Sequence, residues 1–145
     1  MIKRILCVCK GNGDRSPMMA AALKMLLWNA GIEVFCESAG ILQAADGGGG
    51  ASSFMVTAAK RIGIDLSGHE RRWVSKLSLG TYDLFICVDS EVAAHMIGIG
   101  ADIKKVCNAE ISNPWPSQFQ EDFNRTAGRI LAAMFQVVTR YFSSE

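Results

Sequence analysis

Residues 2–17 read IKRILCVCKGNGDRSP, and this stretch decides the fold of the chain. Its first part, residues 2–8, is a compact apolar run followed by a glycine-bearing loop, which is typical of a buried strand. Pro17 stands where the first turn of a helix tolerates proline, and residues 18–29 are rich in good helix formers. We therefore expect the chain to open with a strand, a loop and a helix.

The rest of the sequence continues this alternation. We expect strands at residues 33–37, 82–88 and 103–107, and helices at residues 52–61, 90–97 and 119–141. Strands that alternate with helices are joined by right-handed crossovers, so the sheet should be parallel with helices on both faces. Sheets of this α/β class bind ligands at the carboxyl ends of their strands, which makes the loop after the first strand the natural site.

The composition restricts the function classes that fit. The 145 residues suit one domain, residues 1–145, with a single core. Half of the residues are apolar, a fifth are charged and the formal net charge is +1, so bulk electrostatics favours neither nucleic-acid nor membrane binding. The apolar run near the start is too short for a signal peptide, and no stretch is long enough to span a bilayer. We expect a cytoplasmic protein.

The five cysteines indicate neither a disulfide framework nor a metal site. They show no paired CxxC spacing and no flanking histidines, so we expect no metal and no cofactor. A secreted disulfide framework would have an even count and denser spacing. We interpret four of them as small hydrophobic residues buried in a reducing compartment: Cys7, Cys36, Cys87 and Cys107.

The loop from Cys9 to Ser16 has the composition of an anion cradle. Gly11 and Gly13 permit backbone conformations that turn successive N–H groups inward. The positive end of the following helix points at the same place, and Arg15 offers a planar fork of donors to two phosphate oxygens. All of these groups stabilise a thiolate at Cys9, and a thiolate beneath a bound phosphoryl group is a nucleophile in position.

Two other interpretations of this loop stay open from the residues alone. A dinucleotide-binding fingerprint, GxGxxG, is matched by Gly11 and Gly13 but not by Ser16, and Glu33 or Glu37 lies near the position of a ribose-binding acid. A glycine turn between a strand and a helix can also be purely structural. A Walker loop does not fit, because Asp-Arg-Ser stands where it needs Gly-Lys-Ser/Thr.

Several separated motifs resemble the low-molecular-weight protein tyrosine phosphatases over essentially the whole chain. Residues 8–17, VCKGNGDRSP, are similar to the amino-terminal Cys-x5-Arg-Ser-Pro signature of that family. Further similar segments follow in the family's order: residues 38–40, 63–69 with Arg72 behind them, 82–89 and 113–115. The resemblance implies a three-layer sandwich, flavodoxin-like or phosphotyrosine phosphatase I-like, with a four-stranded parallel sheet of order 2-1-3-4.

The resemblance also implies a role for each residue of the loop. Cys9 would be the nucleophile that forms a phosphocysteine, and Arg15 would bind the phosphoryl oxygens. The phosphate would rest on the whole segment, which comprises Lys10, Gly11, Asn12, Gly13, Asp14, Arg15 and Ser16. Within it, Asn12 would brace the loop and Ser16 would donate a hydrogen bond to the Cys9 thiolate.

Residues outside the loop receive supporting roles by the same resemblance. Ser38 and His69 would complete the bracing network around the loop, and Trp115 would line the substrate cleft. The expected substrate is a phosphotyrosine-bearing protein or a small aryl phosphate. Inorganic phosphate or sulfate should bind in the loop, and no nucleic acid or membrane is expected as a partner.

The sequence departs from the family pattern at three places. Asn113 stands where the family has the aspartic acid that protonates the leaving group, and an amide cannot transfer a proton near neutral pH. Asp14 stands where many relatives have a second cysteine; we expect it to point outward and cap backbone donors, with Lys10 offsetting its charge. The loop at residues 42–50 ends in four glycines and lacks the bulky residues that often form the other wall of the cleft.

These departures leave three functions open. The first is a phosphomonoesterase that acts on phosphotyrosine through Cys9 and is slow because of Asn113. The second is a non-enzymatic pseudophosphatase that binds phosphate or phosphotyrosine. The third, which the sequence favours less, is an arsenate reductase: Cys87 resembles one cysteine of the reductase cascade, but no partner cysteine follows it within the next few residues.

Overall fold

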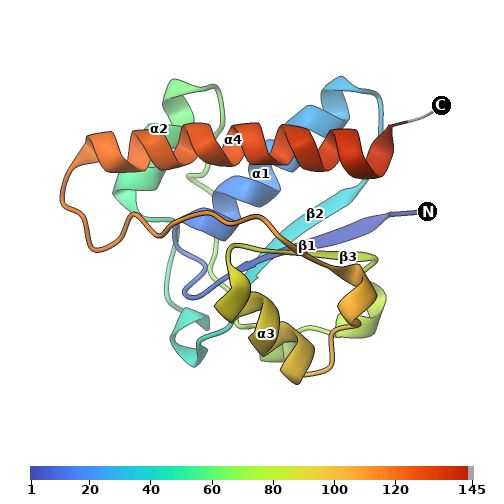
Figure 1. Cartoon of the computed structure of the whole chain (residues 1–145). Helices are drawn as coiled ribbons and strands as arrows, with labels where there is room; N and C mark the ends of the chain where they lie inside the picture. Colours follow the sequence, from blue (N-terminus) through green and yellow to red (C-terminus); the bar gives the residue numbers. More distant parts are fainter. Residues whose placement is uncertain (144–145) are drawn as a thin grey trace.

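The computed structural model describes residues 1–143. Four strands form one parallel sheet, and they are β1 (Arg4–Cys9), β2 (Phe35–Gly40), β3 (Leu84–Cys87) and β4 (Val106–Asn108). They lie side by side in the order β2-β1-β3-β4, with the first strand inside the sheet (Figure 1). The α/β class and the strand order 2-1-3-4 are therefore confirmed.

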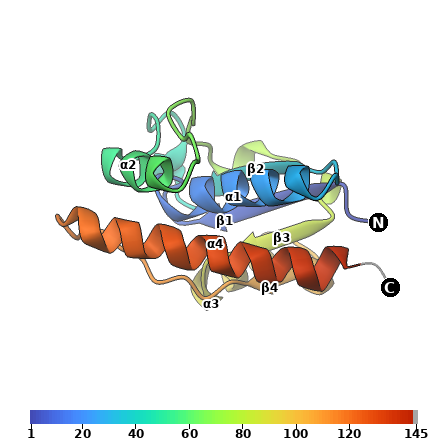
Figure 2. The same ribbon diagram turned by 90° about the horizontal axis from the view of Figure 1, so that it is seen from above.

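Helices cover both faces of this sheet. Their bounds are α1 (Arg15–Asn29), α2 (Ser53–Arg61), α3 (Ser90–Gly98) and α4 (Gln120–Phe142). Figure 1 shows α1, α2 and α4 on one face and α3 on the other, and Figure 2 shows α4 running alongside α1. None of the helices in residues 1–143 is both long and apolar enough to cross a membrane.

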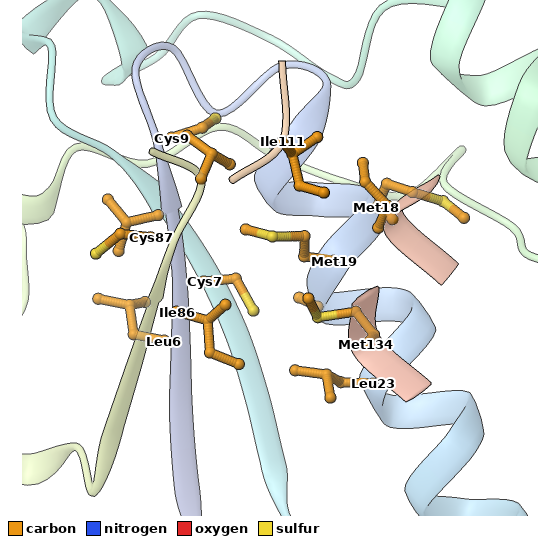
Figure 3. Close-up of a cluster of buried hydrophobic side chains, with 14 of the residues drawn as sticks. Leu6, Cys7, Cys9, Met18, Met19, Leu23, Ile86, Cys87, Ile111 and Met134 are labelled. Carbon is orange, nitrogen blue, oxygen red and sulfur yellow. The ribbon is translucent and has the colours of Figure 1, made fainter. Parts of the chain in front are cut away.

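The core lies between β1 and the helices on either side of it. Residues 5–9 of β1 are all buried, and alternate side chains point to opposite faces. Figure 3 shows Cys7 on the side of Met19, Leu23 and Met134, while Leu6 points to the other side. The central strand is therefore apolar on both faces, as a covered parallel sheet requires.

Short polar caps begin two of the helices. The Ser52 hydroxyl accepts a hydrogen bond of 3.2 Å from the Met55 amide at the start of α2. A carboxylate oxygen of Asp89 accepts one of 2.9 Å from the Val92 amide at the start of α3. Each cap satisfies an amide that the first helical turn leaves unpaired.

Most element boundaries differ from the sequence expectation by one to three residues, and the shifts in β2 and β4 have a visible cause. β2 continues to Gly40 instead of ending at residue 37, because its last residues pair with the end of β1. β4 starts at Val106 instead of residue 103, since a 3-10 turn at Ile103–Lys105 precedes it and the Asp102 side chain caps that turn. The 3-10 turn at Gln43–Ala45 was also not expected in the loop at residues 42–50.

Candidate active site

The candidate site lies at the carboxyl edge of the sheet, in the loop between β1 and α1. This loop, residues 9–16, packs directly on the end of β2. A Cβ on Gly40 would lie 2.6 Å from the carbonyl oxygen of Lys10 and 3.0 Å from the amide nitrogen of Asn12. No other residue fits at position 40 without displacing the loop. The loop therefore packs directly on the Ser-Ala-Gly segment at residues 38–40.

Two polar groups contact the sulfur of Cys9. Cys9 is only 3 % exposed; its Sγ lies 2.9 Å from the Ser16 hydroxyl oxygen and accepts a hydrogen bond of 3.2 Å from the Asn12 backbone amide. The Ser16 hydroxyl also accepts from the Asn12 side chain, and its single proton can be donated to the Ala39 carbonyl at 3.3 Å or to the sulfur. When Cys9 is a thiolate its sulfur can only accept, and the Ser16 proton then stabilises the anion.

Asn12 is the hub of the loop. It is completely buried and has a backbone φ of 57°, a left-handed conformation that asparagine adopts more readily than most residues. Its side-chain nitrogen Nδ2 donates to the hydroxyls of Ser16 and Ser38 at 2.8 and 2.9 Å. Its side-chain oxygen Oδ1 accepts from the Arg72 backbone amide at 2.8 Å. Every hydrogen-bonding position that faces the protein is therefore used.

His69 holds the same residue from the opposite side. Its Nε2 lies 2.8 Å from the Asn12 carbonyl oxygen. Burial lowers the pKa of His69 below its usual value, although the hydrogen bond to Asn12 acts in the other direction. The imidazole is therefore neutral near pH 7, and it donates its Nε2–H to the loop.

A second layer of charged residues supports this network. The Arg72 guanidinium donates to the Ser38 carbonyl at 3.2 Å and lies 3.6 Å from the Glu37 carboxylate. Glu37 also accepts from Arg4 at 2.8 Å and from the Tyr82 hydroxyl at 2.9 Å. This engagement leaves Glu37 no freedom to bind a ribose, so the dinucleotide interpretation loses one of its two candidate acids. The sequence analysis did not identify Glu37 as a support.

Arg15 is buried at the start of α1, with 3 % of its surface exposed. One of its terminal nitrogens donates to the Ile111 carbonyl at 2.9 Å and lies 3.4 Å from Asp89. These contacts come from the ends of β3 and β4, and they fix the plane of the guanidinium at the phosphate loop. Since Asp89 also caps α3, its carboxylate is committed to structure.

The other two charged residues of the loop differ from the expectation. Asp14 caps no backbone donor of α1; its carboxylate accepts a hydrogen bond from the Ser52 hydroxyl, and the Ser52 amide donates to the Gly13 carbonyl at 3.0 Å. Asp14 therefore joins the loop to the start of α2. Lys10 forms an ion pair with Glu91 at 3.1 Å and is not placed to offset Asp14.

A cleft of about 320 Å³ opens beside the loop. It is lined by Lys10, Arg15, Asp89, Ser90, Asn108, Glu110, Ile111, Ser112 and Asn113. Asn113 is exposed, and its side-chain oxygen accepts a hydrogen bond of 3.1 Å from the Trp115 amide. Trp115 is 66 % exposed and is not among the residues that line this cleft, so its role beside a substrate stays a prediction.

The remaining cysteines are separated from Cys9. Cys87 pairs in register with Val8, so its side chain points to the face of the sheet opposite to Cys7 and Cys9 (Figure 3). Burial raises the pKa of the Cys87 thiol to about 12. A disulfide between Cys9 and Cys87 would have to cross the sheet, which argues against the arsenate cascade. Cys36 and Cys107 are half-buried, whereas the sequence analysis expected them to be buried.

Known proteins share this fold. The sequence model of the low molecular weight phosphotyrosine protein phosphatases matches residues 4–136, and the chain belongs to this family. No curated protein sequence matches significantly.

Solved structures of the family have the same fold. Wzb of Vibrio vulnificus in complex with benzylphosphonate is 24 % identical, covers 97 % of this chain and 99 % of its own, and has a TM-score of 0.84. The low molecular weight protein tyrosine phosphatase of T. tengcongensis is 23 % identical, covers 95 % and 99 %, and has a TM-score of 0.86. Wzb of Escherichia coli K30 in complex with sulphate is 23 % identical, covers 97 % and 99 %, and has a TM-score of 0.84.

Proposed function

We propose that this protein hydrolyses phosphomonoesters of the phosphotyrosine type through a phosphocysteine at Cys9. The observation that carries the proposal is the contact of the buried Cys9 sulfur with the Ser16 hydroxyl and with the Asn12 amide, which donates to it, inside a loop that ends in Arg15. Family membership supports a phosphatase, and two neighbours in the comparison hold benzylphosphonate and sulphate. The same loop here would hold the phosphoryl group.

The chemistry proceeds in two displacements at phosphorus. The Cys9 thiolate attacks the phosphoryl group, a sulfur–phosphorus bond forms and the bond to the aryl oxygen breaks. The loop amides and the free guanidinium nitrogens of Arg15 stabilise the charge on the equatorial oxygens. Water then attacks the phosphocysteine, which releases inorganic phosphate and restores the thiolate.

The proton transfers of both steps are impaired. The leaving aryl oxygen needs a proton, and the attacking water must lose one. The family's acid position carries Asn113, whose amide does neither. The aryloxide must therefore take its proton from solvent, and turnover should be slow. Among substrates, those with activated leaving groups such as p-nitrophenolate should react fastest.

A non-enzymatic binding role is the second candidate. Asn113 favours it, because the substitution removes proton transfer while Cys9, Asn12, Ser16 and Arg15 keep their contacts. Such a protein would sequester a phosphotyrosine-bearing partner without hydrolysing it.

One experiment separates the two candidates. We expect slow release of p-nitrophenolate from p-nitrophenyl phosphate by the wild type, lowered at least about 10³-fold in Cys9→Ser. Orthovanadate, which mimics the five-coordinate transition state at phosphorus, should inhibit this release. Complete inactivity of the wild type with retained vanadate binding would select the binding role, and failure to bind vanadate would overturn both.

A further inference from the structure

Arg71 places a guanidinium against the outer side of the phosphate loop. A Cβ built on Gly13 would lie 2.7 Å from the central carbon of this guanidinium and 2.7 and 3.1 Å from its two terminal nitrogens. The group therefore occupies the space that a side chain at position 13 would fill. Since Gly13 belongs to the loop that would hold the phosphate, the guanidinium lies directly beside the backbone of that loop.

The guanidinium is held in this position by the glycine-rich segment at residues 47–50. Its Nε donates to the Gly50 carbonyl at 2.9 Å, and the Arg71 backbone amide donates to the Gly49 carbonyl at 2.9 Å. A Cβ on Gly48 would lie 3.1 Å from the Arg71 side chain, so the lack of side chains there makes room for it. The glycines thus fix an arginine beside the loop in place of a bulky apolar wall.

Among the described residues, 1–143, Arg71 has no acidic partner, unlike the other cations around the loop. The ion pairs of those cations are Lys10–Glu91 at 3.1 Å, Arg15–Asp89 at 3.4 Å and Arg72–Glu37 at 3.6 Å. Within residues 1–143, Arg71 forms no ion pair, and its terminal nitrogens Nη1 and Nη2 donate no hydrogen bond to protein. A fixed arginine with two free donors is suited to bind an external carboxylate in a bidentate manner.

The charges on the two sides of the loop differ in how they are paired. The cleft on the side of β3 and β4 is lined by the cations Lys10 and Arg15, both in ion pairs, and by the acids Asp89 and Glu110. Arg71 lies on the side of the glycine-rich segment and forms no ion pair within residues 1–143. An acidic group on the substrate therefore meets an unpaired cation on that side only.

We propose that Arg71 selects phosphotyrosine peptides that carry a glutamate or aspartate next to the phosphotyrosine. This inference rests on the proposed function, since it needs the phosphoryl group to sit in the loop at residues 9–16. The Arg71 guanidinium then binds the neighbouring carboxylate of the peptide while the loop holds the phosphate. Arg71 acts here in specificity and takes no part in the displacement at phosphorus.

The test compares two phosphotyrosine peptides that differ only in having glutamate or glutamine on both sides of the phosphotyrosine. For the wild type, we expect kcat/KM to be about three- to fivefold higher for the glutamate peptide, the size of a partly exposed ion pair. The preference should fall to about one in Arg71→Gln and shrink with added salt in the wild type. Arg71→Lys should keep part of it, because the charge stays and the fork is lost.

Arg140→Gln is the matched control. It removes the same charge near the end of α4, away from the loop, and the preference for the glutamate peptide should be unchanged. A merely structural role of Arg71 would lower the melting temperature of Arg71→Gln and leave the ratio between the two peptides unchanged. An equal ratio in the wild type and Arg71→Gln, or no preference in the wild type, overturns the proposal.

The same peptides separate this inference from the proposed function. Their affinities for Cys9→Ser, which cannot form a phosphocysteine, report selection without turnover. If the wild type hydrolyses neither peptide but Cys9→Ser binds the glutamate peptide more tightly and the additional Arg71→Gln change removes this difference, hydrolysis fails and the selection stands. If both peptides are hydrolysed at one rate, the selection fails and the hydrolase stands; if neither binds, both are overturned.

Discussion

Two loops line the same cleft and are built in different ways. The loop at residues 9–16 is held by hydrogen bonds to residues far along the chain, among them Ser38, His69 and Arg72. Asn113 is exposed, and within residues 1–143 its side chain bonds only to the backbone two residues away. Contacts from distant parts of the chain therefore hold the first loop, whereas a local contact holds the side chain of Asn113.

This difference explains how the two halves of the chemistry can separate. The proposed phosphate cradle depends on a buried network in which each member needs the others. The proposed proton-transfer position depends on one exposed side chain, which can change without disturbing the cradle. Substitutions in the two loops should therefore have different effects. A substitution at position 113 should change activity and leave stability unchanged, whereas one at position 12 should change both.

The largest expected effect is the gain from Asn113→Asp. A carboxylic acid at this position can protonate the leaving oxygen, so kcat for phenyl phosphate should rise about 10²-fold. The pH–rate profile should acquire a basic limb that the wild type lacks. A wild type that already shows this limb, with no gain in the variant, would contradict the assignment of Asn113.

The Glu110 carboxyl lines the same cleft and serves as the control for that prediction. If no other acid has replaced the family's aspartate, Glu110→Gln should change the wild-type rate less than about twofold. A much larger loss would show that Glu110 has taken over the proton transfer.

The next effect compares one chemical change in both loops. Asn12→Ala removes three side-chain hydrogen bonds and places alanine at a φ of 57°, so it should lower the free energy of unfolding by about 2–4 kcal/mol. Asn113→Ala, at an exposed position, should lower it by less than about 0.5 kcal/mol. Urea unfolding of both variants measures the difference, and equal values would disprove the contrast between the loops.

A smaller effect is expected one layer behind the loop. Burial alone would raise the pKa of Glu37, but the hydrogen bonds from Arg4 and Tyr82 outweigh it and lower the pKa below its usual range. A carboxylate with a lowered pKa stabilises the fold above its unfolded pKa and loses this contribution as the pH falls through its folded pKa. After allowance for solvent screening, Glu37→Gln should cost about 1 kcal/mol at pH 7.

The pH dependence of that cost is the check. The difference between wild type and Glu37→Gln should be constant from pH 6 to pH 8, should begin to decline as the pH falls below the ordinary glutamate pKa of about 4.3, and should vanish below the lowered folded-state pKa. Thermal unfolding across this range measures it. A difference that shows no decline between about pH 5 and pH 3 would mean that Glu37 acts through packing and not through its charge.

The sequence predicted the fold and the central loop well for physical reasons. The apolar run of β1, the glycines after it and the helix formers after Pro17 encode strand, loop and helix locally, and the strand order followed from the family resemblance. β4 was placed too early because Ile103 is apolar like a strand residue, while the Asp102 cap turns the chain there. Local patterns do not report which of two compatible structures the neighbouring side chains favour.

The supporting contacts around the loop were predicted only in part. Ser38 and His69 were named through the resemblance, and the structure brings both to Asn12. Glu37 and Arg71 were missed as contributors, since their relation to the loop comes from strand pairing and from the absence of side chains at Gly13 and Gly48. The sequence shows a glycine at each of these positions but does not show which distant side chain occupies the space beside it.

The separation in sequence between the loop and its braces has a consequence for biosynthesis and for engineering. His69 and Arg72 stand 57 and 60 residues beyond Asn12, so a nascent chain carries Cys9 and its loop long before it holds the residues that brace that loop. An excised peptide with the same signature would lack these braces. Anyone who grafts this motif onto another scaffold must therefore transplant the segment at residues 69–72 together with it.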